Sequence, residues 1–396
     1  MVAAVASARW TSDEHESNER NPPTAQPLGG FFFADGRLEA EGMRGRIDVG
    51  VLGATGMVGQ QFVLQLARHP WFRLAWLGAS ERSAGQSYGD AAPWRLPVPP
   101  PREVAEMRVE AAQPGNAPEL VFSAMDAAVA GGIEQAFAKA GHVVVSNSRN
   151  HRMDVDVPLL IPEVNGDHIA LLARQRAVRG WPGAIVTNPN CSTVFLSMAL
   201  APLRAFGLKS VIVTTLQALS GAGYPGVASL DAVGNVVPFI DGEETKIETE
   251  TKKILGVLTA DHIDPHPVAV SAQTTRVPVV NGHTESIAVA LETRPSIDEV
   301  REAFLRFNGP PQRHGLPTAP LQPLIYLPEQ NRPQPRLDVD REHGMIVSIG
   351  RLRTCPVLGY KFIALGHNTV RGAAGAAVLN AELLVAEGVL AVPVER

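Results

Sequence analysis

The sequence predicts an α/β protein with an N-terminal parallel sheet and a second domain of α+β type. Three observations predict it. Between residues 46 and 189, short apolar runs alternate with amphipathic segments, as strands and helices do in a parallel sheet. Glycines 53, 56 and 59 mark the first strand-to-helix turn. After Ser210, β-branched residues alternate with polar ones, which favours a mixed or antiparallel sheet.

The expected elements follow from these patterns. Strands are expected over 47–52, 72–77, 119–124, 142–145, 184–187, 211–218, 268–276, 284–293 and 345–352. Helices are expected over 60–68, 127–140, 194–203, 238–255 and 296–307. The proline-rich stretch 309–335 is interpreted as a long surface excursion. The small-residue segment 368–387 predicts a helix that packs back on the first domain. The predicted divisions are an extension over 1–45, a first α/β domain over 46–189, a second α+β domain over 190–365 and the C-terminal helix over 366–396.

Composition excludes several classes of protein. With 396 residues, 45% of them hydrophobic and 19% charged, the chain can form two ordinary globular cores. A formal net charge of −5 does not indicate a nucleic-acid partner. The absence of an apolar run of about 18 residues predicts no membrane span. Two cysteines without a CxxC spacing indicate neither a disulfide scaffold nor a metal site, and Pro265 between His262 and His266 favours a loop over a metal pair.

The first 45 residues differ from the rest of the chain. They are polar and interrupted by proline and glycine, so we interpret them as largely disordered. A second possible start of translation is Met43, directly before the first strand. No signal peptide is recognisable, and a cytoplasmic location is the default expectation.

The glycine turn predicts a dinucleotide site. Backbone N–H groups at such a turn face a pyrophosphate, and the following helix adds the positive end of its dipole. The alternative is a tight turn that binds nothing. At the end of the second strand, Ser80, Arg82 and Ser83 suit a 2′-phosphate and favour NADP, whereas Glu81 keeps NAD open. The candidate turn residues are Gly53, Thr55, Gly56, Met57, Val58 and Gly59.

Cys191 is the candidate nucleophile. Asn190 is expected to cap a helix, which places Cys191 in the first turn, where the helix dipole lowers a thiol pKa. The alternative is an inert buried cysteine. Downstream, His283 can serve as its base and Arg276 can clamp a carboxylate with two hydrogen bonds.

Two further clusters carry charge. Glu243 and Lys246 share one helix face, and the alternative is an exposed ion pair. Arg149 follows a parallel strand at the edge where ligands bind, so it can hold a phosphate; the alternative is a basic loop.

Together, these motifs resemble the aspartate-semialdehyde dehydrogenase family, in its archaeal and fungal branch. The resemblance runs from about residue 46 to about residue 386. Its motifs are GATGMVG at 53–59, VFSAMD at 121–126, SNSRNHR at 146–152, PEVN at 162–165, NPNCST at 188–193, QALSGAGYPG at 217–226, GNVVPFIDGEETK at 234–246, RVPVVNGHTES at 276–286 and GRLR at 350–353. No one motif is decisive, but their order is specific.

The resemblance implies a fold and a reaction. The fold is like that of glyceraldehyde-3-phosphate dehydrogenase, with a Rossmann-type NADP-binding domain over 46–189 and a catalytic and dimerisation domain over 190–365. The implied assembly is a homodimer or homotetramer. The reaction is the reversible, NADPH-dependent reductive dephosphorylation of L-aspartyl-4-phosphate to the semialdehyde, a step of lysine, threonine and methionine biosynthesis. The implied catalytic residues are Cys191 (thioester), His283 (acid/base) and Gln217 (orientation). The implied substrate contacts are Arg276, Glu243, Lys246, Arg149 and Asn190, and Ser123 and Asn368 join the cofactor contacts.

One departure leaves the acyl substrate open. Thr274 and Thr275 stand before Arg276 where the family usually has Cys-Asn or a similar pair, and the N-terminal extension is a second difference. An acyl-CoA reductase similar to malonyl-CoA reductase is the alternative enzyme. Acetylglutamyl-phosphate reductases fit less well, because their cysteine turn resembles NPGCY. A catalytically inactive regulatory paralogue is the alternative of a different class.

Overall fold

The computed structural model describes residues 45–390. The predictions for residues 1–44, namely the disordered extension and the alternative start at Met43, lie outside the described residues, as do residues 391–396.

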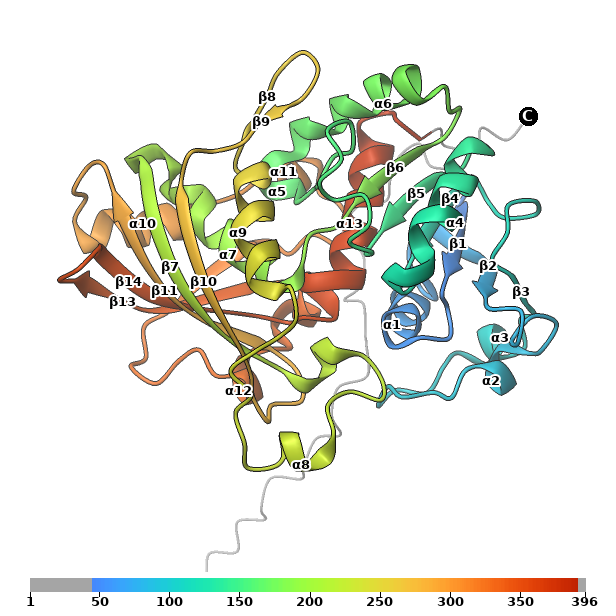
Figure 1. Ribbon diagram of the computed structural model, residues 1–396, viewed down its shortest axis with the longest axis horizontal. Helices are drawn as coiled ribbons and strands as arrows, with labels where there is room; N and C mark the ends of the chain where they lie inside the picture. Colours follow the sequence, from blue (N-terminus) through green and yellow to red (C-terminus); the bar gives the residue numbers. More distant parts are fainter. Residues whose placement is uncertain (1–44, 391–396) are drawn as a thin grey trace, which may run out of the picture. The chain divides into compact units, whose positions relative to one another are not determined.

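The first sheet has six parallel strands in the order β3-β2-β1-β4-β5-β6, which is the Rossmann order (Figure 1). Its strands are β1 (Ile47–Leu52), β2 (Phe72–Ala79), β3 (Val109–Ala111), β4 (Leu120–Ser123), β5 (Val143–Ser146) and β6 (Ala184–Thr187). Every residue of β4, β5 and β6 is buried, as expected for strands covered on both faces. The prediction of a parallel α/β sheet is therefore confirmed.

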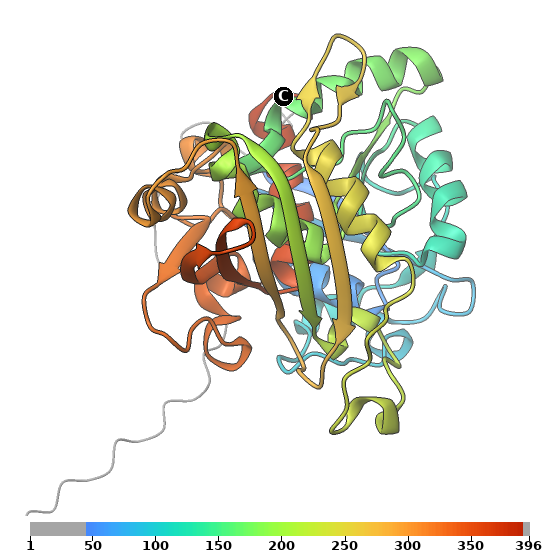
Figure 2. The ribbon, with the colours of Figure 1, turned by 60° about the vertical axis from the view of Figure 1, so that its left-hand side comes forward.

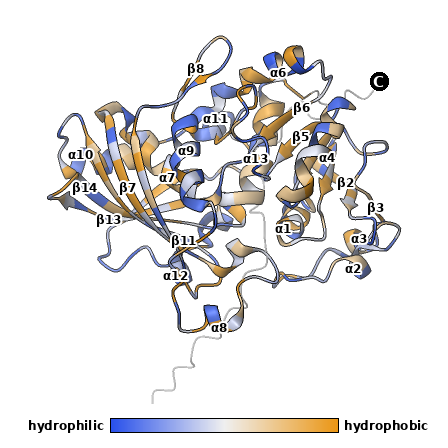
Figure 3. Cartoon of the chain, viewed as in Figure 1, coloured by the Kyte–Doolittle hydropathy of each residue, from blue (hydrophilic) through white to orange (hydrophobic). Residues whose placement is uncertain are grey.

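Helices surround this sheet. In chain order they are α1 (Met57–Leu66), α2 (Tyr88–Ala91), α3 (Arg102–Ala105), α4 (Ala127–Lys139), α5 (Pro162–Asn165), the 3₁₀ turn η1 (Gly166–Ala170) and α6 (Leu171–Arg179). The C-terminal segment joins the same core through η5 (Val370–Ala374), a π-helical turn, and α13 (Gly375–Ala386). Strands β4–β6 and helix α13 form an apolar centre in Figure 3. The predicted return of the C-terminal helix to the first sheet is confirmed.

The second sheet is mixed, in the order β10-β7-β11-β14-β13-β12. Its strands are β7 (Leu208–Gln217), β10 (Ala269–Arg276), β11 (His283–Leu291), β12 (Leu324–Leu327), β13 (Val347–Cys355) and β14 (Gly359–Gly366). The pairs β10–β7 and β12–β13 are parallel, and the other pairs are antiparallel. A separate two-stranded sheet joins β8 (Val257–Leu258) and β9 (Ile263–Asp264).

The remaining elements pack around the second sheet or connect it. They are α7 (Cys191–Leu200), η2 (Ala201–Phe206), η3 (Leu219–Ala222), α8 (Ser229–Ala232), α9 (Glu243–Ile254), α10 (Ile297–Arg306), α11 (Pro310–His314), α12 (Pro335–Asp338) and η4 (Arg341–Gly344). Helix α7 is buried almost throughout, in a core that it shares with α9 and the inner face of the sheet.

The two faces of the second sheet differ. Along β7 and β11 buried residues alternate with less buried ones, so one face packs on α7 and α9. The other face carries Ile212 and Leu216 of β7, which are 49% and 39% exposed. In Figure 2 strands β11, β7 and β10 lie toward the viewer with no helix in front of them.

Two predictions about local structure were wrong, and one strand was missed. Residues 309–335 are not only a surface excursion, because they contain β12, whose Leu324 is fully buried and which extends the sheet in parallel with β13. The helix predicted over 238–255 begins at Glu243, after Gly242 with a left-handed backbone. Strand β14 was not predicted at all. In each case pairing with a distant strand, or a single backbone angle, decided the local structure.

No helix within residues 45–390 is both long and apolar enough to cross a membrane.

Candidate active site

Three predicted site residues form a row across the inner face of the second sheet. Arg276 of β10 pairs in register with Gln217 of β7. His283 begins β11 and stands one residue before Thr284, which pairs with Leu216 next to Gln217. All three side chains are buried, at 7%, 1% and 0% exposure in the order Arg276, Gln217, His283. The sheet therefore places a cation, an amide and an imidazole side by side although they come from separate strands.

The turn before α7 presents Cys191 to this row. Asn190 has a non-helical backbone (φ −55°, ψ 144°), and its Oδ1 accepts hydrogen bonds from the N–H groups of Ser192 (3.0 Å) and Thr193 (3.2 Å). This is the geometry of an N-cap, which satisfies donors that the helix cannot satisfy itself. The predicted cap is confirmed, and Cys191 is the first residue of the helix.

Glu243 connects the turn with the row. Its Oε1 accepts hydrogen bonds from Asn190 Nδ2 (2.6 Å) and Gln217 Nε2 (3.2 Å), and its Oε2 lies 3.0 Å from Lys246 Nζ. Glu243 is only 6% exposed, so the alternative of a fully solvated ion pair is wrong for the carboxylate. Lys246, its partner at i+3, is half-buried. Hydrogen bonds and the Lys246 charge hold the pKa of Glu243 below its usual value despite burial.

The Cys191 thiol is not activated in the way that the sequence predicted. Burial, and then the Glu243 carboxylate, raise its pKa to about 12. The Ser192 N–H, Arg276 and Arg152 act in the opposite direction but are weaker. Cys191 retains some exposed surface, yet its sulfur is surrounded by protein. The expected fall in pKa at the start of the helix is wrong in this structure, because burial and the Glu243 carboxylate outweigh the Ser192 N–H and the two arginines.

Ala218 orients both His283 and Arg276. The Ala218 N–H donates to His283 Nδ1 at 3.0 Å, and the Ala218 carbonyl accepts from Arg276 Nη1 at 2.7 Å. Because Nδ1 is an acceptor, the proton of the neutral imidazole lies on Nε2. Within the described residues Nε2 has no partner, so this N–H is available to a ligand. Burial and nearby Arg276 and His367 lower the pKa of His283 well below its usual value.

Gly221 leaves the space between these two groups open. A Cβ at this position would lie 2.9 Å from Arg276 Nη1 and 3.0 Å from His283 Nε2. The imidazole edge and the guanidinium therefore face the same small volume, where a side chain at residue 221 would compete with a ligand.

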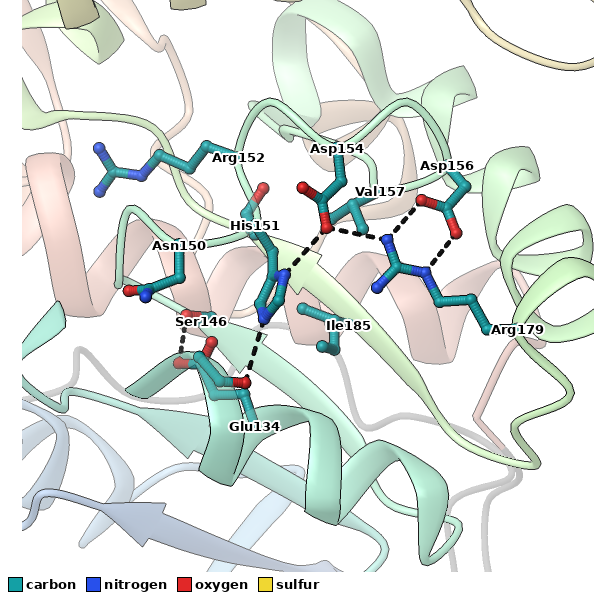
Figure 4. Close-up of polar contacts among 12 residues, drawn as sticks. Glu134, Ser146, Asn150, His151, Arg152, Asp154, Asp156, Val157, Arg179 and Ile185 are labelled. Atoms are coloured by element: carbon teal, nitrogen blue, oxygen red, sulfur yellow. Dashed lines mark hydrogen bonds and ion pairs between the residues drawn. The ribbon is translucent and has the colours of Figure 1, made fainter. Parts of the chain in front are cut away.

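The basic loop after β5 contains two arginines with different environments. Arg149 is exposed, and no hydrogen bond of the described residues joins it to Glu243, Gln217 or Arg276. Arg152 is buried, and it points away from the His151–Asp154–Arg179 cluster (Figure 4). Its charge is close enough to Cys191 to lower the thiol pKa.

Sequence reasoning missed Arg152 and its partner Glu250. Arg152 Nη1 donates to Glu250 Oε1 at 2.9 Å. The motif SNSRNHR contained Arg152, but its pattern did not show which arginine is directed inward. Glu250 lies seven residues, about two helical turns, after Glu243, so the helical period could have placed both on one face.

The glycine turn has the shape of a dinucleotide cradle. Gly53 has a φ of 72°, and Gly56, at the exposed N-cap of α1, leaves its backbone accessible. At Gly59 a Cβ would lie 2.2 Å from the Gly53 carbonyl oxygen, so only glycine lets the helix pack on the turn. The turn residues therefore fit a dinucleotide pyrophosphate at the N-terminus of α1. Thr55, Met57 and Val58 are half-buried around it.

The other predicted cofactor residues lie in different surroundings. The N–H of Gly53 bonds to the carbonyl of Gly78, which brings the turn next to the end of β2. There Ser80 and Arg82 are exposed and Ser83 is half-buried, so they are accessible to a ribose phosphate. Ser123 is fully buried at the end of β4.

Asn368 is already engaged within the protein. Its Oδ1 accepts the Gly282 N–H at 2.9 Å, and its Nδ2 donates to Ser220 Oγ at 2.8 Å. Its cofactor contact, like the other assigned roles, remains a prediction.

Thr274 and Thr275, which depart from the family pattern, connect β10 to helix α9 and to strand β7. Thr275 Oγ1 donates to the Thr215 carbonyl at 2.6 Å, and the N–H of Thr274 donates to Glu244 Oε1 at 3.1 Å. Thr274 is fully buried, two residues before Arg276 on the same face of β10. Within residues 45–390 no group of three or more His, Cys, Asp or Glu side chains is arranged to hold a metal ion.

Comparisons with known proteins agree with this geometry. Residues 48–172 match the NAD-binding domain of semialdehyde dehydrogenases, and residues 200–371 match their dimerisation domain. The chain therefore belongs to the semialdehyde dehydrogenases, and the second domain fits an oligomeric protein.

Individual relatives identify the family more narrowly. Aspartate-semialdehyde dehydrogenase from Methanothermobacter thermautotrophicus is 49% identical over 343 residues, which cover 85% of this chain and 99% of the relative. The enzyme from Cryptococcus neoformans is 49% identical over 362 residues, covering 88% and 99%. The crystal structure of the Candida albicans enzyme with NADP superposes with a TM-score of 0.81 at 42% identity, covering 87% and 100%. The chain belongs to the aspartate-semialdehyde dehydrogenase family, and the resemblance to archaeal and fungal members is confirmed.

Proposed function

We propose that this protein catalyses the reversible, NADPH-dependent reductive dephosphorylation of L-aspartyl-4-phosphate to L-aspartate-4-semialdehyde. The observation that carries the proposal is the buried constellation around Cys191, in which a carboxylate, an amide, a guanidinium and an imidazole converge. Family membership supports the same reaction. An acyl phosphate with an α-amino and an α-carboxylate group offers a partner for each of these groups.

In the proposed reaction the Cys191 sulfur bonds to the acyl carbon, and phosphate leaves with the electrons of the broken C–O bond and takes up the thiol proton. Arg276 binds the α-carboxylate and Glu243 binds the α-ammonium group. The ammonium group reduces the effect of Glu243 on the thiol, so substrate binding lowers the Cys191 pKa from its raised value. Gln217 orients the resulting thioester.

His283 acts from its Nε2–H. The backbone donor at Nδ1 supports this tautomer. The Nε2–H donates a hydrogen bond to the oxyanion of the acyl group. When the thiohemiacetal oxyanion collapses, the C–S bond breaks, the C=O bond re-forms, and the sulfur leaves as a thiolate that accepts a hydrogen bond from the same N–H. The role proposed for His283 is therefore that of a hydrogen-bond donor at Nε2.

Two cations are proposed for the phosphate. Lys246 lies beside Glu243, and Arg152 lies buried behind the Cys191 turn. Arg149, proposed from the sequence, is exposed and better suited to an incoming phosphate than to one held at the thiol.

The proposed cofactor is NADP(H), held by the glycine turn and by Ser80, Arg82 and Ser83. When bound, the nicotinamide supplies the hydride. The crystal structure of the Candida albicans relative contains NADP, which supports this choice over NAD. We further propose a homodimer or homotetramer that buries the exposed face of β7 with Ile212 and Leu216, and a cytoplasmic location.

The test is oxidation of aspartate semialdehyde by the full chain with NADP and inorganic phosphate. We expect NADPH formation that requires phosphate. A parallel reaction contains malonate semialdehyde and coenzyme A, because an acyl-CoA reductase is the alternative enzyme. NADPH formed only with coenzyme A would reject the aspartyl assignment, and no turnover in either reaction would favour the inactive paralogue.

A further inference from the structure

Glu250 is a buried carboxylate that contacts two parts of the site at once. It lies on α9, and its side chain is 3% exposed. Its Oε2 accepts the Asn190 N–H at 2.6 Å, and its Oε1 accepts Arg152 Nη1 at 2.9 Å. One oxygen therefore holds the peptide next to Cys191, and the other holds the loop that follows β5.

Three polar groups of Asn190 each have a hydrogen-bond partner. Its N–H bonds to Glu250, its Nδ2 bonds to Glu243, and its Oδ1 caps α7. Since Cys191 is the next residue, the position of its sulfur depends on this peptide. A nucleophile displaced by about 1 Å can lose about 100-fold in rate.

Arg152 is held from both sides. Besides Glu250, its Nη2 donates to the carbonyl of Asn147 at 2.7 Å, and its side chain is 9% exposed. Its Nε is buried and has no hydrogen-bond partner within the described residues. Burying an ion pair costs desolvation energy, and breaking one leaves an uncompensated buried charge. Glu250 is the ion-pair partner of this arginine among the described residues.

We propose that Glu250 is a positioning residue that holds the Asn190–Cys191 peptide and Arg152 in place and balances the charge of Arg152 behind the thiol. The proposal rests on the proposed function for its link to turnover. The groups that act on the thiol pKa are Arg152, Arg276, Glu243 and the Ser192 N–H. The structure supplies a reason for a carboxylate here, because two donors need two acceptor oxygens and a glutamine has only one.

The test compares Glu250→Gln with Glu248→Gln in the full chain. Glu248 lies on the same helix, and its Oε1 accepts the Ala272 N–H of β10 at 3.0 Å, so it controls for loss of a charge on α9. Both variants carry Cys355→Ser, which removes the other cysteine. For Glu250→Gln we expect kcat to fall about 10- to 100-fold while KM for the semialdehyde changes less than about 2-fold. Glu248→Gln should keep kcat within about 2-fold of the parent.

A second readout requires no substrate. The rate of Cys191 alkylation by iodoacetamide, followed against pH, reports the thiolate. In Glu250→Gln the unbalanced charge of Arg152 should lower the thiol pKa, so alkylation at a given pH becomes faster although turnover is slower. Glu250→Asp keeps the charge with a shorter side chain, so we expect wild-type alkylation and an intermediate kcat.

Either of two results would overturn the proposal. One is a loss of kcat in Glu250→Gln no greater than in Glu248→Gln. The other is an unchanged alkylation profile, because a purely structural role would not move it. If Glu250→Gln does not fold, Glu250→Asp with wild-type kcat has the same meaning. Absence of phosphate-dependent turnover in the wild type would instead reject the proposed function. The alkylation test would still show whether Glu250 affects the Cys191 thiol, because it requires no substrate.

Discussion

The two sheets differ in the groups that they offer to a ligand, which are backbone groups in the first and side chains in the second. Strands β4, β5 and β6 of the first sheet are buried on both faces, and the ligand-facing groups lie in the backbone of the glycine turn. In the second sheet buried and less buried residues alternate, and the candidate chemistry lies in side chains on the inner face. The first site is therefore sensitive to an added Cβ atom, whereas the second is sensitive to a changed functional group.

The largest expected effect concerns the side-chain site. Cys191→Ala should lower turnover by about 10⁴-fold or more, because the acyl acceptor is lost. NADP binding and the melting temperature should stay near the wild-type values, since the turn at Gly53–Gly59 is untouched. Turnover and NADP titration measure the two effects separately. Retained turnover would show that the nucleophile lies elsewhere.

Arg276→Lys tests the same face with the charge retained. Lysine cannot both donate to the Ala218 carbonyl, as Arg276 does at 2.7 Å, and bind a carboxylate with a two-pronged fork. We expect KM for aspartate semialdehyde to rise about 10- to 100-fold with KM for NADP unchanged. Steady-state kinetics at varied concentrations of aspartate semialdehyde and of NADP measure the two KM values. An unchanged KM would place the carboxylate site elsewhere.

Gly59→Ala tests the backbone site. Its Cβ would lie 2.2 Å from the Gly53 carbonyl oxygen, so the turn must shift, with a loss of about 1–3 kcal/mol in unfolding free energy and weaker NADP binding. Chemical denaturation and NADP titration measure both. Gly56→Ala is the matched control, because its Cβ would meet the same oxygen at an ordinary 3.5 Å. Equal loss of stability in both variants would contradict the close packing proposed for Gly59.

Glu285 offers a smaller, pH-dependent test. It lies on β11 beside Thr215, fully buried, and neither carboxylate oxygen has a hydrogen-bond partner within residues 45–390. Burial raises its pKa well above the usual value, against a smaller opposing effect of the Ser192 hydroxyl. Its contribution to stability is therefore complete below the ordinary glutamate pKa and is lost as pH rises through the folded-state pKa.

Glu285→Gln should remove this loss of stability at higher pH. At about pH 4 or below, the variant and the wild type should unfold with similar free energies, and at higher pH the variant should become more stable by about 1–3 kcal/mol. Denaturation at a series of pH values measures the difference. Parallel pH profiles would mean that folding does not raise the pKa of Glu285.

Much of the architecture could be read from local patterns. The glycine spacing, the short apolar runs and the small-residue helix predicted the first sheet and the return of α13. Asn190 before an apolar run predicted the N-cap. Strand β12 could not be predicted in this way, because its proline-rich surroundings resemble a loop and only pairing with β13 makes it a strand.

The candidate site also contains residues that the sequence identified and contacts that only the structure shows. Cys191, Gln217, Arg276 and His283 were found from residue types and motif order, and the sheet brings the last three into one row. The contact between Arg152 and Glu250 joins residues 98 positions apart, and no local pattern specifies which arginine of the loop is turned inward.

By itself the sequence determined the alternation of strands and helices in the first domain, the identity of the candidate nucleophile and the cap that places it at the start of α7. Only the tertiary structure decided the pKa of that nucleophile. Burial and the Glu243 carboxylate raise the Cys191 pKa, and both come from chain segments far from the cysteine turn. Local sequence sets the backbone around a residue, whereas distant segments set its solvent exposure and its charged neighbours.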